Sequence, residues 1–361
     1  MLKVAIVGCG KIADGHVEEI GKMPEVARVV AAMDLELIMA EQLATRYALP
    51  AFYDDFDRML AEAKPDVVHV TTPPGSHLAL ATKAFEAGCH VFCEKPLTMN
   101  LADSRLLIAR AAEHGKKVTV GYTYLFDPPA LAMRELLGAG VLGEPVHVES
   151  YFGYGLSGPF GAAVLGDPNH WVHRLPGKLF HNNIDHMLNK LLEFVDDDEP
   201  RIHAFGLKRR PGTFGDDRDS MQDELRVSIA GARVTAYGTF SAHAKPAGHF
   251  ARVYGTKNTA HVDYVNRSVT LEAVASFPSA IGRLFPPFEQ GIQHLRQGGR
   301  NVMRFAKNDF HFFAGLNRLF RSFYQSIEGG APLPISHRDM LRVAWMLDEI
   351  WKQVPQHGRT S

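Results

Sequence analysis

Apolar and amphipathic segments alternate along the first third of the chain. Strand-like apolar runs occur at residues 2–7, 26–33, 51–53, 67–70, 91–95 and 118–120. Stretches with helical periodicity separate them, at 16–23, 37–47, 56–63, 78–87 and 101–114. This alternation is typical of parallel strands joined by helical crossovers, so we expect a parallel sheet covered on both faces. The first domain is expected to span residues 1–121.

The pattern changes after residue 121. Strand-like runs follow without regular helical crossovers, at 146–152, 201–207, 224–229, 234–240, 250–254, 260–262 and 269–273. Two connections, 230–232 and 265–267, have hairpin length. A mostly antiparallel sheet is the natural product, with one face under helices and one face free. We expect a second, α+β domain over 122–361, whose last helix can pack back on the first domain. Its free sheet face is a candidate surface for a homodimer or homotetramer.

The second domain also contains helical patterns, at 130–137, 181–195, 311–327 and 338–351. In 181–195 a rotation of about 100° per residue gathers apolar residues on one side and polar residues on the other. The apolar side holds Ile184, Leu188, Leu191 and Val195, and the polar side holds Asn182, His186, Asn189 and Glu193. The polar side is expected to face a cleft or solvent. In 311–327 the apolar stripe is Phe312, Leu316, Leu319, Phe323 and Ile327.

Composition narrows the function classes. The chain has 361 residues, 46% hydrophobic and 22% charged, with a formal net charge of -1. Neither a nucleic acid nor an anionic membrane is an expected partner, because both normally require a concentrated basic field. No signal peptide or membrane span is expected. The three cysteines, Cys9, Cys89 and Cys93, lack metal-type spacing and are expected to be buried free thiols in a reducing cytoplasm.

A glycine turn follows the first strand. Gly8, Gly10 and the adjoining Lys11 and Ile12 form a strand–turn–helix pattern typical of dinucleotide binding. Gly8 permits the tight turn, Gly10 keeps a Cβ away from a pyrophosphate, and the helix N-terminus offers amide donors. The second strand ends at Asp34, where a carboxylate accepts both hydroxyls of a ribose and repels a 2'-phosphate. We therefore predict NAD, with NADP less favoured; the alternative role for Asp34 is a helix N-cap.

Two further loops are predicted at the same sheet edge. Thr71, Thr72 and Pro73 follow the fourth strand and are candidate cofactor contacts; His77 is either another contact or only the first residue of a helix. Glu94 and Lys95, followed by a proline, end the fifth strand. A charge beside a buried strand is costly unless it is paired or used, so we assign both residues to the site, the alternative being a surface pair.

Candidate ligand contacts in the second domain are Tyr124, Trp171, His173, Asn182 and His186. A lone histidine on a polar stripe is most often a solvated surface residue, which is the alternative for His186. Residues 196–199 are four consecutive acids, interpreted as a solvated loop and not as a metal site. The basic segment 283–307 is interpreted as a lid, an oligomer contact, a site for an anionic substrate group or a solvated surface.

The glycine turn, Glu94-Lys95-Pro96, and Asn182 four residues before His186 together resemble the glucose-fructose oxidoreductase, inositol dehydrogenase and rhizopine-catabolism (Gfo/Idh/MocA) family. The resemblance implies hydride transfer between a nicotinamide and a sugar, cyclitol or sugar derivative. It assigns Lys95 and His186 as catalytic residues, Trp171 to the cofactor, and implies a cis peptide bond between Lys95 and Pro96.

The chain departs from the family pattern at two positions. Asn182 stands where the family often has aspartate, and a carboxylate there would raise the basicity of the histidine. Leu125 stands where many members have an arginine. The predicted chemistry is a proton transfer to His186, whose unperturbed pKa would be near 6.5, with Lys95 stabilising the reacting oxygen. His181, Tyr124 and His173 are the next candidates for the base. The alternatives are an NAD-binding regulator without turnover and an NAD-dependent glycosidase.

Overall fold

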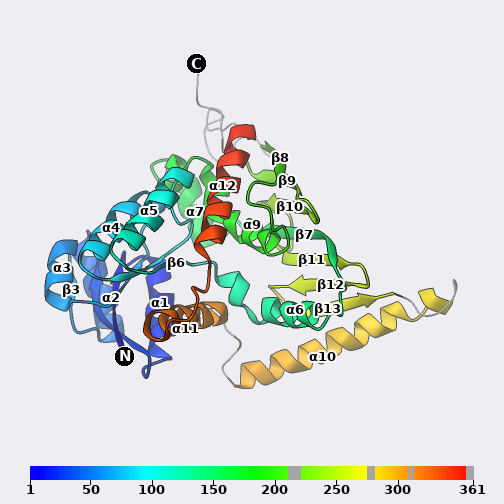
Figure 1. Cartoon of the computed structure of the whole chain (residues 1–361), viewed down its shortest axis with the longest axis horizontal. Helices are drawn as coiled ribbons and strands as arrows, with labels where there is room; N and C mark the ends of the chain where they lie inside the picture. Colours follow the sequence, from blue (N-terminus) through cyan, green and yellow to red (C-terminus); the bar gives the residue numbers. More distant parts are fainter. Residues whose placement is uncertain (210–220, 275–280, 308–309, 311–312, 355–361) are drawn as a thin grey trace, which may run out of the picture. The chain divides into compact units, whose positions relative to one another are not determined.

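The computed structural model describes residues 1–209, 221–274, 281–307, 310 and 313–354, and the chain forms two compact units (Figure 1). The first unit comprises Met1–Thr123 and Gly315–Trp345. The second comprises Tyr124–Ala314 and Met346–Ser361. The first unit therefore gains a segment, 315–345, that the sequence pattern had placed in the second domain.

The first unit contains a six-stranded parallel sheet, as predicted. Its strand order is β3-β2-β1-β4-β5-β6. The strands are β1 (Leu2–Val7), β2 (Ala27–Met33), β3 (Phe52–Tyr53), β4 (Val67–Val70), β5 (His90–Cys93) and β6 (Val118–Val120). The crossovers are α1 (Lys11–Gly21), α2 (Leu37–Tyr47), α3 (Phe56–Ala63), η1 (Pro74–Ser76), α4 (His77–Glu86) and α5 (Leu101–Glu113). Strands β1, β4 and β5 are almost wholly buried, which explains why they read as continuous apolar runs.

Helix α11 (Ala314–Gly329) explains why the later segment clusters with the first unit. Leu316, Leu319 and Phe323 of the predicted stripe are buried, while Phe312 lies outside the described residues. Phe320 also packs there, with its ring centroid 4.8 Å from that of Phe92 on β5. The long helix α12 (His337–Gln353) begins in the first unit and ends in the second.

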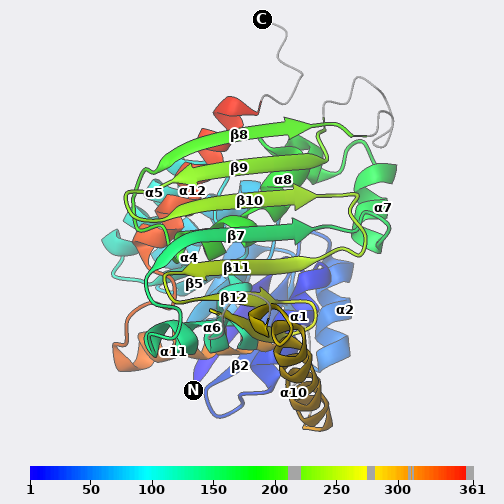
Figure 2. The ribbon, with the colours of Figure 1, turned by 90° about the vertical axis from the view of Figure 1, so that its right-hand side faces the viewer.

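The second unit contains a seven-stranded sheet in the order β13-β12-β11-β7-β10-β9-β8. Its strands are β7 (Pro145–Gly153), β8 (Arg201–Leu207), β9 (Glu224–Ala230), β10 (Thr235–Ser241), β11 (His249–Gly255), β12 (Asn258–Asp263) and β13 (Ser268–Ala273). Only the β7–β10 pair is parallel among these strands, so the predicted mostly antiparallel sheet is confirmed. Figure 2 shows its broad face, with α8 (Lys178–Asn183) behind the strands.

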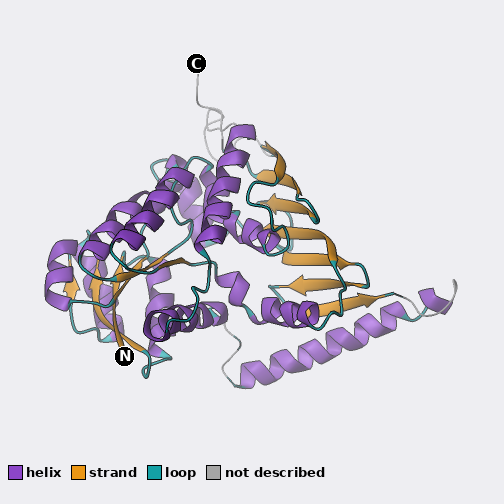
Figure 3. Cartoon of the chain, viewed as in Figure 1, coloured by secondary structure: helices purple, strands orange, loops and turns teal. Residues whose placement is uncertain are grey.

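Helices and strands of the second unit are distinguished by colour in Figure 3. Its other helices are η2 (Thr123–Phe126), α6 (Pro128–Gly138), α7 (Pro159–Gly166), η3 (Trp171–Arg174), α9 (Asp185–Leu192), η4 (Ile281–Arg283) and α10 (Pro286–Ala306). The predicted single helix 181–195 is divided at Ile184 into α8 and α9. The sequence pattern missed α7 and α10 as helices. None of the described helices is both long and apolar enough to cross a membrane.

A glutamine side chain from α12 covers one edge of the seven-stranded sheet. Gln353 accepts a hydrogen bond from the Ala204 amide at 3.0 Å and donates one to the Ile202 carbonyl at 3.0 Å. Both partners lie on the edge strand β8. Backbone groups that would otherwise be open to another strand are therefore occupied.

Candidate functional site

The glycine turn and the threonine loop are joined by hydrogen bonds in the first unit. Thr71 Oγ1 donates to the Gly8 carbonyl at 2.6 Å and to the Val7 carbonyl at 3.0 Å. Gly8 has φ +94°, and a Cβ there would lie 2.6 Å from Thr72 Cγ2. Glycine is therefore required both by the backbone conformation and by the approach of Thr72. The two loops lie side by side, as their shared sheet edge predicted.

The start of α1 leaves space for a ligand. Gly10 is the N-cap of α1, and among the described residues no heavy atom other than those of Gly10 and its chain neighbours lies within 4 Å of the position its Cβ would take. Lys11, the first helical residue, is exposed, whereas Ile12 is half-buried. An open helix N-terminus of this kind suits a phosphate group, because amide N–H groups point outward from it.

Asp34 lies beside this turn. Its Oδ2 accepts the Cys9 amide at 2.7 Å, and its Oδ1 accepts the Glu36 amide at 3.1 Å. Helix α2 begins later and has Glu36 as its N-cap, so Asp34 is not the N-cap that was its alternative role. A carboxylate adjoining the glycine turn, an open helix N-terminus and a close-packed Gly8 together fit a dinucleotide with free ribose hydroxyls.

Lys95 follows β5 and is half-buried, and the peptide bond to Pro96 is cis, as the family resemblance implied. Glu94 is buried, and its Oε2 accepts the Lys95 amide at 3.2 Å. A Cβ at Gly121 would lie 2.9 Å from Glu94 Oε1, so this glycine makes room for the carboxylate. The pair is thus a built feature of the fold and not a solvated surface pair.

A chain of buried hydrogen bonds leads away from Glu94. His16 Nε2 lies 3.0 Å from Glu94 Oε1, His16 Nδ1 lies 2.9 Å from His69 Nδ1, and His69 Nε2 lies 2.9 Å from the Tyr324 hydroxyl. Two arrangements of protons pair these contacts: with a neutral His16 the Tyr324 hydroxyl donates to His69, His69 to His16 and His16 to Glu94, whereas a protonated His16 donates to both Glu94 and His69, and His69 donates to Tyr324. The sequence pattern did not identify His16, His69 or Tyr324.

The electrostatics of the line favour an ionised Glu94 and a neutral His69. Burial by itself raises the pKa of Glu94, but the hydrogen bond and charge of His16 and the charge of Lys95 outweigh it, so the pKa lies below its usual value. Burial, followed by the proximity of His16, holds the pKa of His69 well below its usual range. An ionised carboxylate next to Lys95 is thus bound by the His16 ring, with the neutral His69 ring behind it.

His77 connects two of the predicted loops from behind. Its Nδ1 lies 3.0 Å from the Leu97 carbonyl, and its Nε2 lies 2.8 Å from the Thr72 carbonyl. The side chain is fully buried and is the first residue of α4. In this structure His77 positions the Thr72 loop and the segment after Pro96, and it does not face open space as a direct cofactor contact would.

His186 begins the first turn of α9 in the second unit, and its side chain is only 13% exposed. Its Nδ1 lies 4.0 Å from Asp185 Oδ1, and the Tyr124 ring meets its ring edge-on at a centroid distance of 4.8 Å. The alternative interpretation of His186, a solvated surface histidine, is therefore wrong. Tyr124 and His186, both predicted from sequence, lie together.

The rest of the predicted polar stripe is also covered. Asn182 and Asn189 are buried, and Glu193 pairs with Arg134, whose Nη2 donates to Glu193 Oε2 at 3.0 Å. The expectation that a cleft or solvent lies along the whole stripe is corrected, because Asn182 and Asn189 are buried and the side chains of His186 and Glu193 are only 13% and 19% exposed.

A fully buried lysine, Lys190, lies one turn beyond His186. It contacts His249 Nε2 through Nζ, and Nζ lies 4.8 Å from the Tyr264 ring centroid. Burial lowers the pKa of Lys190 well below its usual range, although the charges of Asp127 and Asp185 act in the opposite direction. The sequence carried a signal for it, since a residue four positions after His186 is rotated by only about 40° on a helix.

The remaining predicted residues lie nearby in the chain but make structural contacts. Trp171 and His173 are half-buried in η3, and His173 Nε2 lies 2.8 Å from the Val164 carbonyl. His181 accepts a hydrogen bond from Trp351 Nε1 at 3.1 Å. The acidic run 196–199 is a loop, in which Asp197 accepts the Ala232 amide at 3.0 Å.

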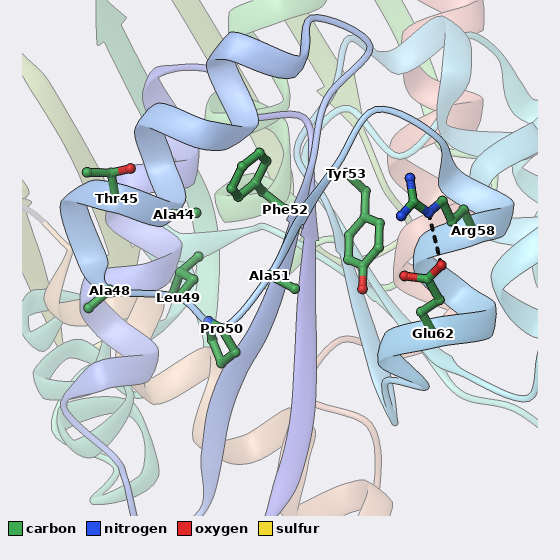
Figure 4. Close-up of a pocket in the computed structure, with 10 residues that line it drawn as sticks. All are labelled: Ala44, Thr45, Ala48, Leu49, Pro50, Ala51, Phe52, Tyr53, Arg58 and Glu62. Carbon is green, nitrogen blue, oxygen red and sulfur yellow. Dashed lines mark hydrogen bonds and ion pairs between the residues drawn. The ribbon is translucent and has the colours of Figure 1, made fainter.

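A hollow of about 450 Å³ in the first unit is a different feature (Figure 4). It lies between the end of α2, β3 and α3, and the Arg58–Glu62 ion pair at 2.9 Å borders it. None of the predicted site residues lines it. We therefore place the candidate site at the glycine turn and Lys95.

A family model matches the first domain. Residues 2–122 match the model described as an oxidoreductase family (Gfo/Idh/MocA) with an NAD-binding Rossmann fold. The first domain belongs to the Gfo/Idh/MocA oxidoreductase family. It therefore has an NAD-binding fold, as the glycine turn and Asp34 predicted.

Relatives of this family resemble the chain in different ways. A D-glucoside 3-dehydrogenase of Escherichia coli K12 is 36% identical over 143 residues, which are 40% of this chain and 41% of the relative. An inositol 2-dehydrogenase of Burkholderia cenocepacia is 31% identical over 147 residues, 40% of this chain and 44% of the relative. The matches thus span less than half of these curated relatives. The structure of a levoglucosan dehydrogenase in complex with NADH and levoglucosan has a TM-score of 0.78 at 17% identity, covers 98% of this chain and 96% of its own, and shows the shared fold.

Proposed function

We propose that the protein is an NAD-dependent oxidoreductase that transfers hydride between the nicotinamide and a carbinol or carbonyl carbon of a sugar, cyclitol or nucleotide sugar. The observation that carries the proposal is the anchored Glu94-Lys95 pair at the end of β5, in a domain of an NAD-binding oxidoreductase family. The names of the relatives, a glucoside dehydrogenase and an inositol dehydrogenase, support the substrate class.

Oxidation of a carbinol removes a hydride from carbon and a proton from oxygen. NAD, when bound, accepts the hydride. We assign the proton to the His186 imidazole, because a histidine needs little tuning to act as a base near neutral pH. Lys95 is proposed to hydrogen-bond the same oxygen and to stabilise its negative charge as the proton leaves.

Other residues are proposed to bind and orient the ligands. Tyr124, His173 and Asn182 are assigned to substrate hydroxyls, and Trp171 to the cofactor. Asp34 is assigned to the ribose hydroxyls, which favours NAD over NADP. Asp34→Ser is expected to reduce the preference for NAD over NADP. The three cysteines are buried thiols, which supports a reducing, cytoplasmic location.

The test is an absorbance assay of NADH formation with the full chain and a panel of sugars, cyclitols and nucleotide sugars. Lys95→Met is expected to lower kcat by about a hundredfold or more while NAD still binds. Lys83→Met, at an exposed lysine, is the matched control. His186→Asn is expected to remove the fall in rate at low pH.

Three outcomes would contradict the proposal. Full turnover in Lys95→Met with intact NAD binding would exclude the proposed role of Lys95 in stabilising the reacting oxygen. Glycosidic cleavage without net NADH formation would identify the glycosidase alternative, and NAD binding without turnover on any carbinol would identify the regulator.

A further inference from the structure

Asp185 carries a buried carboxylate beside the proposed base. It is the first residue of α9, and its side chain is fully buried. Its Oδ1 accepts the His186 amide at 2.8 Å and lies 4.0 Å from His186 Nδ1. The second distance is too long for a hydrogen bond but is that of an ion pair once the ring is protonated. One carboxylate therefore contacts both the backbone and the ring of the next residue.

The two ring nitrogens of His186 differ in what they can reach. Nδ1 is buried on the side of Asp185. The side chain as a whole is 13% exposed, so its exposed surface belongs to other atoms. A neutral imidazole carries a proton on one nitrogen and a lone pair on the other. Because a buried nitrogen cannot meet a substrate, Nε2 is the nitrogen that can take a proton from one.

The position of His186 in α9 calls for a nearby negative charge. It is the second residue of this helix. The amide N–H groups at a helix start form the positive end of the helix dipole, which disfavours a protonated imidazole. A carboxylate in the first turn has the opposite effect, and Asp185 is the acid of that turn.

Other titratable and charged groups of this cluster come from the neighbouring elements: Tyr124 on η2, Asp127 at the start of α6, Lys190 on α9, His249 on β11 and Arg267 before β13. Burial, followed by the charges of Lys190 and His186, holds the pKa of His249 well below its usual range. Burial also lowers the pKa of Lys190, against the charges of the two acids. Neutral Lys190 and His249 add no positive charge beside the His186 ring, so Asp185 acts on it without a competing cation from that pair.

We propose that Asp185 is a positioning residue for His186. Its carboxylate keeps a proton on Nδ1, which leaves the lone pair of Nε2 for the substrate, and it stabilises the doubly protonated ring. The inference rests on the proposed function and deepens it. When the hydride of the carbinol carbon passes to NAD, the proton of the carbinol oxygen passes to Nε2, and Nδ1 keeps its own proton beside Asp185.

NMR of the full chain with isotope-labelled histidine tests the first effect without any activity. The His186 resonances are identified as those missing from His186→Asn. At a pH where the ring is neutral, the nitrogen shifts show which nitrogen carries the proton, and Nδ1 is the expected carrier. A proton on Nε2 would overturn the proposal. This measurement uses the wild-type chain, so it decides the matter even where a variant at Asp185 fails to fold.

The second effect is measured as the pH midpoint of the same resonances. Asp185→Asn keeps an oxygen for the His186 amide and removes the charge. The midpoint is expected to fall by about one pH unit, a tenfold loss of proton affinity, because a nearby opposite charge favours the charged ring. Asp198→Asn, at an exposed acid of the same unit, is the matched control and is expected to leave the midpoint unchanged. An unchanged midpoint in folded Asp185→Asn would also overturn the proposal.

The pH dependence of NADH formation separates this inference from the proposed function. A base must be unprotonated to act, so in Asp185→Asn the fall in rate at low pH is expected to move to lower pH by the same amount as the midpoint. A merely structural role of Asp185 would lower the rate at every pH without moving the profile. If the midpoint falls and the rate profile stays, Asp185 does act on His186, and the proposed role of His186 as the base is the part that is wrong.

Discussion

The two units bury polar groups in different ways. In the first unit, Glu94, His16, His69 and Tyr324 form a line in which each group has a hydrogen-bond partner. In the second, Lys190 and His249 lie within a compact group that also holds two acids. A line of paired groups positions a residue, whereas a compact group of competing charges changes protonation easily.

The largest expected effect comes from breaking the line at its centre. His16→Leu leaves the Glu94 carboxylate without its imidazole donor, and it is expected to lower the free energy of unfolding by about 3 kcal/mol. Chemical denaturation followed by circular dichroism measures the change. His114→Leu, at an exposed helix end, is the control and is expected to cost less than about 0.5 kcal/mol.

In His16→Leu the pH dependence of the unfolding free energy is also expected to change. The pKa of Glu94 is lowered in the folded protein, so its contribution is fully present above the unfolded pKa of about 4.3 and is lost as the pH falls through the lower folded value. His16→Leu is expected to remove this acid-side loss. An unchanged acid profile would show that the line does not hold the carboxylate in its ionised form.

The second effect concerns the lysine of the compact group. Because the pKa of Lys190 is lowered by folding, the unfolded chain binds a proton that the folded chain releases, and stability rises with pH between the folded value and about 10.4. Lys190→Met is expected to remove up to about 1.4 kcal/mol per pH unit of this rise. The measurement is the difference in pH dependence between variant and wild type.

Lys257→Met, at an exposed lysine of the same unit, is the control for this experiment and is expected to keep the wild-type dependence. Equal slopes in wild type and Lys190→Met would mean that Lys190 stays charged in the folded protein. The proposed difference between the Glu94 line and the Lys190 group would then be wrong.

The smallest effect lies at the far end of the line. Tyr324→Phe removes only the hydroxyl that donates to His69, with an expected cost of about 1 kcal/mol. In the double variant with His16→Leu, the loss of unfolding free energy is expected to be smaller than the sum of the losses in the two single variants, because the line is already broken. Full additivity, measured by denaturation, would show that the four groups act independently.

The sequence predicted what local periodicity determines. The bounds of α2, α3, β4 and β6 match the structure, because short crossovers and buried strands leave a strong local pattern. The glycine turn and Asp34 were found for the same reason. The placement of α11 with the first unit could not be read in this way, since it depends on contacts such as Phe320 with Phe92.

Parts of the site were missed because their partners are distant in the chain. His16 and His69 are separated by 53 residues, and Lys190 and His249 by 59. Neither pair alters the local pattern of hydrophobic and polar residues in the sequence, so neither could be found from it. Helix α10 was missed for another reason: its basic residues and paired glycines, Gly298 and Gly299, weakened the helical pattern of the segment.

The glutamine side chains at the margins of the seven-stranded sheet bear on how the protein behaves when concentrated. Gln353 occupies backbone groups of β8, and Gln293 and Gln297 occupy those of β13. A stray extended segment, from this chain or another, therefore meets amides already engaged at either border. An added strand would have to displace these glutamine side chains, which disfavours fibre-like growth from either edge of the sheet.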